Sequence, residues 1–327
     1  MTNLVTGANG HLGNNVVRAL LDAGQSVRAS VRNPNEREPF AGLDVEIVKA
    51  DLMDRDSLMR ALEGVDTLYQ VAAVFKHWAK NPEEEIIRPA VDGTRNILTA
   101  AAEQGVKRIV YVSSSVTIEA HGRKVTEADL RTETHGNPYY VAKIESEKLA
   151  WKLAQEYKLN MVSVLPVAIV GPHCYRLTPT MNVLDLVLKG SFRFDVNFFF
   201  NYVDARDVAA GMLLAADKGR SGERYLLSTE SQPMSTQDVT AIAREFNPKI
   251  PSTFRMPKPI LAGMATMMEL GGQVTGRDPL LLRSQIKLFY GVEEMHDISK
   301  AKRELGYNPR SSEQAVREAL AYLQSRQ

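Results

Sequence analysis

Short apolar runs alternate with longer segments of helical period over the first half of the chain. Six apolar runs bounded by turn residues predict strands at 2–6, 26–31, 44–49, 66–72, 107–112 and 161–166. The segments between them predict helices near 11–23, 56–62, 84–104 and 138–156. Strands and helices that alternate in this way form a parallel sheet with right-handed crossover connections. The expected fold is therefore an α/β, doubly wound parallel sheet.

The alternation weakens after Pro166. Residues 172–202 mix proline, cysteine and aromatic side chains, and four prolines lie between positions 248 and 259. Such clusters are typical of loops and short irregular elements. We expect a principal domain over 1–171 and a smaller domain mainly over 172–327, with parts near 203–228 returning to the principal domain.

The composition is that of an ordinary globular protein, with 44% hydrophobic and 24% charged residues. The 40 basic and 39 acidic residues are scattered along the chain and give a net charge of +1. This balance provides no electrostatic footprint for nucleic acid or an anionic membrane surface. Small molecules or other protein chains are the expected partners.

Cys174 is the single cysteine, which excludes an internal disulfide and an all-cysteine metal site and favours a reducing compartment. Neither His77 nor His173 has an acidic or histidine partner at metal-ligand spacing, so no metal is expected. We expect no signal peptide, and no apolar stretch reaches the ~18 residues that a membrane span requires. The expectation is a cytoplasmic protein without a membrane partner.

A glycine-rich turn links the first predicted strand to the first predicted helix, with the sequence Gly7-Ala8-Asn9-Gly10-His11-Leu12-Gly13. Glycines at such a turn let the backbone approach a pyrophosphate that the first helical amides bind. The spacing is G-x-x-G-x-x-G and departs from the general dinucleotide fingerprint, because Asn9 separates Ala8 from Gly10. The motif predicts a phosphate cradle, and its alternative is a turn that only connects strand and helix.

The end of the second strand bears on the choice of cofactor. An acidic residue there would bind the ribose hydroxyl of NAD, whereas an arginine suits the 2′-phosphate of NADP. The chain reads Val31-Arg32-Asn33 and has no acidic residue before Glu36. Arg32 therefore favours NADP(H) with NAD(H) still possible, unless Arg32 is simply a solvated surface residue.

Tyr139 and Lys143 stand four residues apart at the start of a long predicted helix, so they share one helix face. A nearby ammonium group can lower the phenol pKa from ~10 and make the pair an acid–base catalyst. Tyr140 has Ile144 in the corresponding place. The alternative is a tyrosine that packs under the helix beside a surface lysine.

Three serines, residues 113–115, follow the fifth predicted strand, and ligands bind at strand ends of this kind. One hydroxyl could bind the reacting oxygen of a substrate. The serines could equally end the strand by bonding to backbone groups.

The segments TGANGHLG at 6–13, YVSSS at 111–115 and YYVAK at 139–143 occur in this order on the expected elements. Together they resemble the extended short-chain dehydrogenase/reductase family of the NAD-dependent epimerase/dehydratase superfamily, which has a Rossmann fold. The segment RELGYNP at 303–309 extends the likeness to nearly the whole chain. VRASVRNP at 27–34 and RPAVDGT at 88–94 look more like the dihydroflavonol reductase and cinnamoyl-CoA reductase branch than like sugar epimerases.

The resemblance implies that the first domain binds the dinucleotide and the second mainly the substrate. It implies that Ser114 orients the substrate oxygen, with Ser115 as its rival, and that Tyr139 donates the proton in reduction. Lys143 would bind the nicotinamide ribose and lower the pKa of Tyr139. The implied cofactor contacts, beyond Tyr139, Lys143 and Arg32, are Gly7, Asn9, Gly10, His11, Leu12, Gly13, Asp51, Leu52, Ala72, Pro166, Val167 and Ile169.

The expected activity is hydride transfer between NADP(H) and an aldehyde, ketone or alcohol of a small, apolar substrate. Aromatic residues of the expected substrate segments motivate this prediction: Phe75, Trp78, Tyr175, Phe192, Phe194 and Phe198 to Phe200. They could instead form the core of the second domain. The alternatives are an epimerase or dehydratase that retains NAD, a hydroxysteroid dehydrogenase-like enzyme, and a non-catalytic nucleotide sensor, which would have no use for the Tyr–Lys pair.

A homodimer is also expected. The helices near 84–104 and 138–156 offer apolar positions, Ile86, Ile87, Leu149 and Trp151, and members of the family commonly pair these helices.

Overall fold

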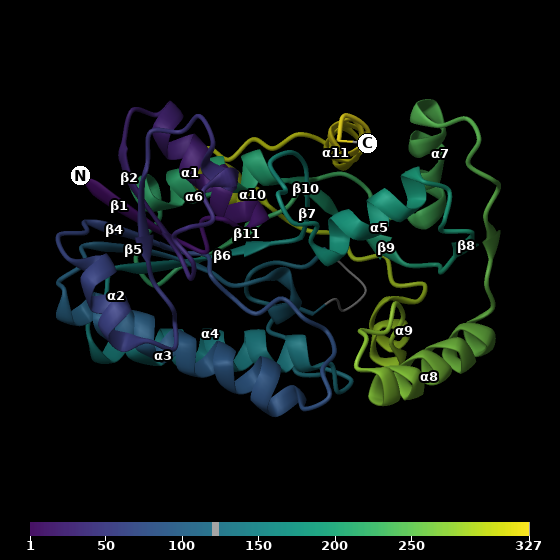
Figure 1. Ribbon diagram of the computed structural model, residues 1–327, viewed down its shortest axis with the longest axis horizontal. Helices are drawn as coiled ribbons and strands as arrows, with labels where there is room; N and C mark the ends of the chain where they lie inside the picture. Colours follow the sequence, from purple (N-terminus) through teal and green to yellow (C-terminus); the bar gives the residue numbers. More distant parts are fainter. Residues whose placement is uncertain (120–123, 327) are drawn as a thin grey trace.

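Seven parallel strands form the sheet at the centre of the first lobe (Figure 1). The computed structural model describes residues 1–119 and 124–326. The strand order is β11-β6-β5-β4-β1-β2-β3. The strands are β1 (Thr2–Thr6), β2 (Ser26–Val31), β3 (Glu46–Lys49), β4 (Thr67–Gln70), β5 (Arg108–Val112), β6 (Met161–Pro166) and β11 (Arg224–Leu227). The prediction of a doubly wound parallel sheet is confirmed, while β11 is a strand that the hydrophobic pattern did not predict.

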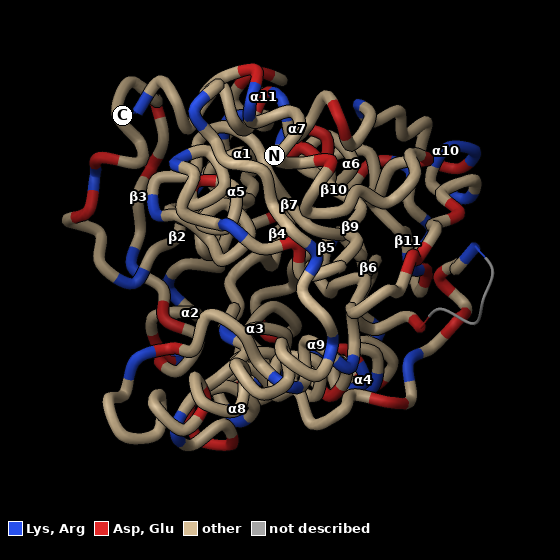
Figure 2. The backbone as a smooth tube through the Cα atoms, turned by 90° about the vertical axis from the view of Figure 1, so that its right-hand side faces the viewer, with Lys and Arg blue, Asp and Glu red and all other residues tan. Residues whose placement is uncertain are grey.

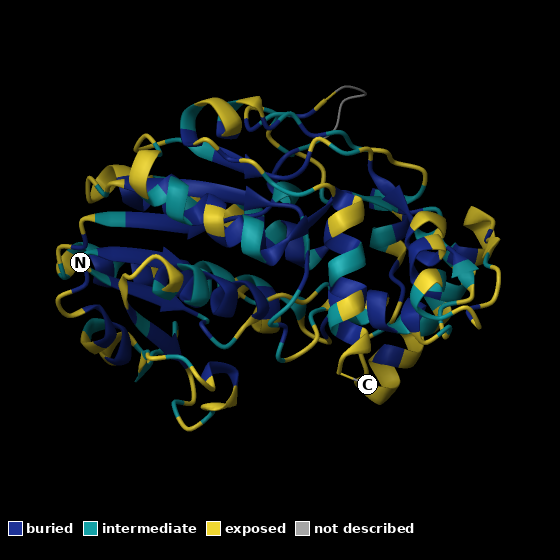
Figure 3. Ribbon diagram, turned by 90° about the horizontal axis from the view of Figure 1, so that it is seen from above, coloured by how far each residue is buried: buried dark blue, intermediate teal, exposed yellow. Residues whose placement is uncertain are grey.

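Helices cover both faces of this sheet. On one face, α1 (His11–Asp22) lies beside α6 (Ala205–Lys218). The other face carries α2 (Arg55–Leu62), α3 (Arg88–Glu103) and α4 (Pro138–Glu156) (Figure 1). A π-helical segment, Glu83–Ile87, leads into α3. Because both faces are covered, the central strands β4, β5 and β6 are buried along most of their length (Figure 3), whereas the edge strand β3 is not.

A second lobe is built from shorter elements. Its helices are α5 (Pro179–Leu188), α7 (Thr236–Phe246), α8 (Lys258–Thr275), α9 (Arg283–Phe289) and α11 (Ser312–Gln324). Three two-stranded sheets accompany them: β7 (Ala168–Val170) with β10 (Tyr202–Asp204), β9 (Phe199–Phe200) with β12 (Met234–Ser235), and β8 (Phe194–Asp195) with β13 (Phe254–Arg255). Its main core packs α5, α7 and α11 together.

The chain crosses between the lobes more than once. Strand β11 pairs with β6 in the large sheet, and α10 (Ser299–Leu305) packs against β11 and α6. Most residues near 203–228, those of α6 and β11, therefore belong spatially to the first lobe, although they follow residue 171 in the sequence. We propose a domain division near residue 171, with these two elements returning to the first domain.

The carboxyl ends of the central strands point toward the second lobe (Figure 1). Ligands of doubly wound sheets bind at this edge. Lys, Arg, Asp and Glu are interspersed along the chain in Figure 2. In the part of the chain that the structure describes, no helix combines the length and apolar character that a membrane span requires.

The apolar residues that led to the dimer prediction pack against other residues of the same chain. Ile86 is fully buried and forms a small cluster with Ala79 and Ala142. Leu149 and Trp151 are partly buried against the core on the α3 and α4 side of the sheet. The homodimer therefore stays a prediction without a surface assigned to it.

Candidate active site

One cavity of about 930 Å³ lies at the carboxyl edge of the sheet, between the two lobes. Every residue that the sequence assigned to catalysis or cofactor binding lines it: Gly7, Asn9, Gly10, His11, Leu12, Gly13, Arg32, Asp51, Leu52, Ala72, Ser114, Tyr139, Lys143, Pro166, Val167 and Ile169. Most of these residues lie at or just after the carboxyl ends of strands β1 to β6, while Tyr139 and Lys143 come from α4 and Ile169 from β7. The sheet topology thus brings them together although they are spread over 163 positions, from residue 7 to residue 169.

The glycine turn between β1 and α1 has no room for a side chain at Gly7 or Gly13. Gly7 adopts a φ of +61°, and a Cβ atom there would lie 3.0 Å from the Cα atom of Ala72. A Cβ atom on Gly13 would lie 2.2 Å from the carbonyl oxygen of Gly7. Gly10, the N-cap of α1, provides no side-chain cap for the first helical amides. A close backbone turn with uncapped amides fits the pyrophosphate of a dinucleotide.

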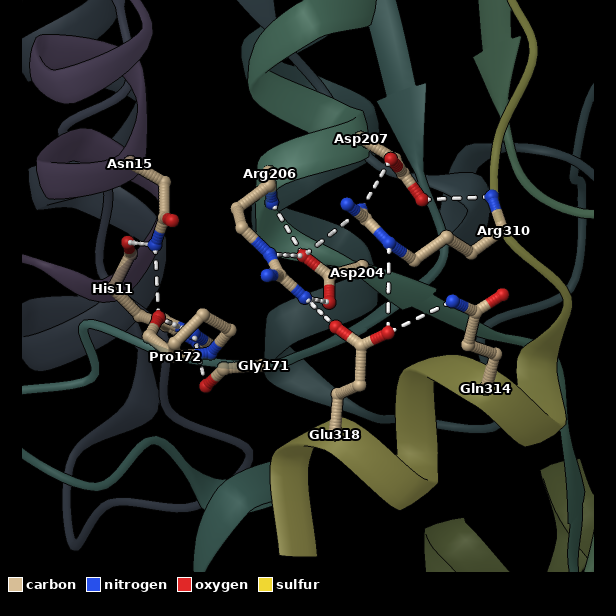
Figure 4. Close-up of polar contacts among 10 residues, drawn as sticks. All are labelled: His11, Asn15, Gly171, Pro172, Asp204, Arg206, Asp207, Arg310, Gln314 and Glu318. Atoms are coloured by element: carbon tan, nitrogen blue, oxygen red, sulfur yellow. Dashed lines mark hydrogen bonds and ion pairs between the residues drawn. The ribbon is translucent and has the colours of Figure 1, made fainter. Parts of the chain in front are cut away.

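His11 ties this turn to the second lobe. Its Nε2 lies 3.1 Å from the carbonyl oxygens of both Gly171 and Pro172 (Figure 4). Because carbonyl oxygens only accept hydrogen bonds, Nε2 carries the proton. Burial lowers the pKa of His11 to about 4, which keeps the ring neutral. Asn15 Nδ2, one turn along α1, donates to the Pro172 oxygen at 3.0 Å.

Tyr139 is fixed at the first turn of α4. Pro138 occupies the first helical turn, and the Asn137 side chain caps the helix by accepting from the Tyr139 N–H at 3.1 Å. The Tyr139 side chain forms a hydrogen bond with that of Ser114. Ser113 is directed elsewhere, because its hydroxyl donates to Glu147 at 2.8 Å. The geometry therefore favours Ser114 among the three serines, and Ser115 begins a short 3₁₀ turn at the cavity wall.

The pKa relation between Tyr139 and Lys143 differs from the expectation. Burial raises the pKa of Tyr139 to about 12, and the hydrogen bond with Ser114 opposes this rise. Lys143 Nζ donates to the Val112 carbonyl oxygen at 3.2 Å. Burial lowers the pKa of Lys143 to about 8. The predicted lowering of the Tyr139 pKa by Lys143 is thus not seen, because burial dominates the pKa of both groups.

Glu147 is a part of the site that the sequence analysis missed. It lies one turn beyond Lys143 on α4 and is buried. Its carboxylate accepts from the Ser113 and Ser163 hydroxyls at 2.8 and 2.9 Å and from Arg224 Nε at 3.0 Å. The negative charge of Glu147 raises the pKa of Lys143 against the effect of burial. The spacing of Lys143 and Glu147 was a usable signal, since residues four apart share a helix face.

Aromatic rings surround Tyr139 on the cavity side. The ring centroids of Phe75 and His77 lie 5.1 and 4.8 Å from that of Tyr139. Burial lowers the pKa of His77 to about 4, so this ring is neutral near pH 7. Its buried Nδ1 has no hydrogen-bond partner within residues 1–119 and 124–326.

The remaining substrate side of the cavity is mostly apolar. Its walls include Val116, Phe199, Phe200, Leu288 and Phe289. Only part of the aromatic set expected here reaches the cavity: Trp78, Tyr175, Phe192, Phe194 and Phe198 lie outside its walls. The alternative interpretation is correct for several of these, because Phe198 is buried in a cluster with the α8 and α9 helices and Phe192 packs on the core of the second lobe.

One end of this apolar region is polar. Arg131 packs over the Tyr140 ring, with its guanidinium carbon 5.1 Å from the ring centroid, and its Nε donates to the Val116 carbonyl oxygen. The terminal nitrogens of Arg131 lie 3.8 and 3.9 Å from the carboxylates of Glu119 and Glu294. These distances are beyond hydrogen-bond range, and two carboxylates more than balance the single positive charge.

The opposite end of the cavity leads to a smaller pocket of about 280 Å³, with Asn9 and Arg32 in the walls of both. Asn33, Glu36 and Arg176 complete the smaller pocket. The Glu36 carboxylate accepts from Asn9 Nδ2 at 3.4 Å and from Arg176 at 3.1 Å. The loop after β2 thus folds back and brings the Glu36 carboxylate to the pocket at the end of this strand. The position of Glu36 in the sequence did not indicate this contact.

Comparison with known proteins agrees with this geometry. The sequence model of the NAD dependent epimerase/dehydratase family matches residues 3–228. The chain belongs to this family. Within it, the chain is 35% identical to sterol demethylase protein B of Methylococcus capsulatus, over 100% of this chain and 99% of the relative. It is 32% identical to a putative dihydroflavonol 4-reductase of Synechocystis, over 98% and 94% of the two chains.

A solved structure supports the same assignment. The crystal structure of gox2253 superimposes with a TM-score of 0.85 at 31% identity, covering 99% of this chain and 98% of the other. The expected membership of the extended short-chain dehydrogenase/reductases, with likeness to the dihydroflavonol reductase branch, is therefore confirmed. As a member of the NAD dependent epimerase/dehydratase family, the chain is an NAD(P)-dependent enzyme.

Proposed function

We propose that the chain is a carbonyl reductase that transfers hydride from NADP(H) to an aldehyde or ketone of a small, apolar substrate. The observation that carries this proposal is the hydrogen bond between the side chains of Tyr139 and Ser114 inside a cavity with apolar walls. The pair offers two hydroxyl groups to one substrate oxygen, next to the glycine turn that fits a dinucleotide.

The residues of the first lobe would hold the cofactor from end to end. The glycine turn would bind the pyrophosphate through the amides at the start of α1. Asp51 and Leu52, which line the cavity, would contact the adenosine, while Pro166, Val167 and Ile169 would lie beside the nicotinamide. When bound, the nicotinamide supplies the hydride that reduces the carbonyl carbon. Lys143 is the residue that would donate to the nicotinamide ribose.

Tyr139 would supply the proton. A tyrosine with a pKa of about 12 is protonated at neutral pH, as a proton donor must be. Ser114 would donate a hydrogen bond to the carbonyl oxygen and hold it at the Tyr139 hydroxyl. The ammonium of Lys143 would favour the phenolate that forms when Tyr139 gives up its proton. The reverse reaction, alcohol oxidation, uses the same groups with the proton moving back to Tyr139.

The walls of the cavity support an apolar substrate over a nucleotide sugar. A nucleotide diphosphate requires several basic residues to meet its charge. Outside the residues assigned to the cofactor, the cavity walls offer two basic side chains, Lys76 and Arg131, and Arg131 already faces the carboxylates of Glu119 and Glu294. The similarity to a putative dihydroflavonol 4-reductase points in the same direction. A hydroxyl group could accept from Arg131 and donate to Glu294, so a carbonyl compound with a second, distant hydroxyl would suit this end.

The test is to follow NADPH absorbance with the purified chain against aromatic aldehydes, flavanonols, steroids, aliphatic ketones and nucleotide sugars. We expect oxidation of NADPH with at least one apolar carbonyl compound and none with nucleotide sugars. Conversion of a nucleotide sugar without net change of an added cofactor would replace this proposal by an epimerase or dehydratase activity.

A further inference from the structure

A short segment of the second lobe crosses the glycine turn of the first. This crossing segment, residues 171–176, follows β7. Its first two carbonyl oxygens accept hydrogen bonds from His11 and Asn15 at the start of α1 (Figure 4). The crossing segment therefore lies directly beside the turn that fits the pyrophosphate.

The base of the crossing segment is fixed by a buried ionic network. Gly171 has a φ of +123°, and a Cβ atom there would lie 3.1 Å from the Asp204 carboxylate. Asp204 is completely buried and accepts from Arg206 Nε at 2.8 Å. Arg206 also contacts Glu318 of α11, and Arg310 lies between Glu318 and Asp207 (Figure 4). This network holds the start of the crossing segment in one position.

The far end of the crossing segment is anchored from both lobes. Arg326 Nη1 donates to the Cys174 carbonyl oxygen at 2.6 Å. The Tyr175 hydroxyl donates to the Glu38 carboxylate on the loop after β2. Arg176, the next residue along the chain, lines the smaller pocket together with Arg32.

The charges in the smaller pocket favour an anion. Two guanidinium groups, Arg32 and Arg176, face one carboxylate, that of Glu36. The Arg32 side chain has no ion pair or hydrogen bond with any other residue that the structure describes. Arg176 is 70% exposed and has the Glu36 carboxylate as its ion-pair partner at 3.1 Å. A phosphate dianion offers three acceptor oxygens and pairs with two guanidinium groups better than one carboxylate does.

We propose that Arg176 and Arg32 together bind the 2′-phosphate of NADP(H), with Asn9 as a neutral donor. Glu36 holds the Arg176 guanidinium at this place until the phosphate replaces its carboxylate. The inference rests on the proposed function, because it assumes that a dinucleotide lies along the glycine turn. It adds that a residue of the second lobe takes part in the choice between NADP(H) and NAD(H).

The experiment is a fluorescence titration of the full chain with NADPH and NADH, repeated for Arg176→Met. We expect the variant to bind NADPH about tenfold more weakly or worse, since a hydrogen bond to a charged group is lost, and NADH within twofold of the parent. Arg317→Met is the matched control, because Arg317 is also an exposed arginine paired with a glutamate but lies on α11 outside both pockets. It should bind both cofactors like the parent.

Competition with 2′,5′-ADP and 5′-ADP isolates the phosphate itself. Arg176→Met should weaken 2′,5′-ADP and leave 5′-ADP unchanged, and Glu36→Gln should bind 2′,5′-ADP at least as tightly as the parent. Equal loss for both nucleotides, or no loss of NADPH affinity in Arg176→Met, overturns the inference and leaves the proposed function intact. A parent chain that binds neither NADPH nor NADH overturns both.

Discussion

Glu147 lies one helical turn beyond Lys143 on α4, and both residues are buried, although only Lys143 lines the cavity. The carboxylate raises the pKa of Lys143, whereas burial lowers it to about 8. Glu147 is in turn held by Arg224, whose side chain is only 12% exposed. The charge state of Lys143, the proposed ribose-binding residue, therefore depends on the ion pair between Glu147 and Arg224, neither of which lines the cavity.

Removing this carboxylate should make Lys143 lose its proton at lower pH. We expect Glu147→Gln to lower the pKa of Lys143 below about 8, because burial then acts without an opposing negative charge. The alkaline limb of the pH profile of kcat/KM should move to lower pH. Glu145→Gln, which alters an exposed pair with Lys148 on the same helix, should leave that limb in place. An unchanged limb in Glu147→Gln would separate Glu147 from the charge state of Lys143.

Replacing Tyr139 by phenylalanine should remove turnover and spare cofactor binding. The change deletes one hydroxyl and little volume, and general acid catalysis is typically worth ~100-fold to ~10,000-fold. Tyr140→Phe is the matched control, because its ring also lines the cavity but packs against the Arg131 guanidinium. Steady-state kinetics and NADPH titration of both variants test this. Similar loss of kcat in the two variants would contradict the assignment of Tyr139.

Local patterns sufficed for six of the seven strands of the large sheet and for the helix that carries Tyr139 and Lys143. Strand β6 was predicted at 161–166 and is found at Met161–Pro166, because buried parallel strands have continuous apolar sequences. Tyr139 and Lys143 were paired correctly on one helix face, since helical spacing is a local property.

Contacts between distant segments left no local signal. His11 forms hydrogen bonds with Gly171 and Pro172, about half of the chain away. Glu147 of α4 accepts from Arg224 of β11. The hydrogen bond between Asn9 and Glu36 depends on the conformation of the loop that follows β2. Aromatic residues posed a different problem, because Phe198 in the core and Phe199 at the cavity are neighbours in sequence with the same chemistry.

Two glycines should respond to alanine in opposite ways. Gly13→Ala places a Cβ atom 2.2 Å from the Gly7 carbonyl oxygen, where backbone must move, so we expect lower stability and weaker NADPH binding. Gly263 lies in α8 with no atom within 4 Å of its added Cβ. Gly263→Ala should stabilise the chain by about 0.5–1 kcal/mol, because alanine loses less backbone entropy in a helix. Urea unfolding of both variants measures this, and equal destabilisation would contradict it.

The chain should lose stability as the pH falls from about 6.5 toward 4, in part because of His77. Its pKa is about 4 in the folded chain and near 6.5 when unfolded, since burial disfavours the imidazolium. In this window the unfolded chain binds the proton and the folded chain does not, so acid favours unfolding. His77→Phe keeps an aromatic ring but cannot titrate, and should reduce the stability difference between pH 7.5 and pH 5 by about 1–2 kcal/mol. Urea unfolding at both pH values checks this, with His135→Asn, at an exposed histidine, as the control. A pH dependence in His77→Phe equal to that of the parent would show that His77 does not remain neutral in the folded chain.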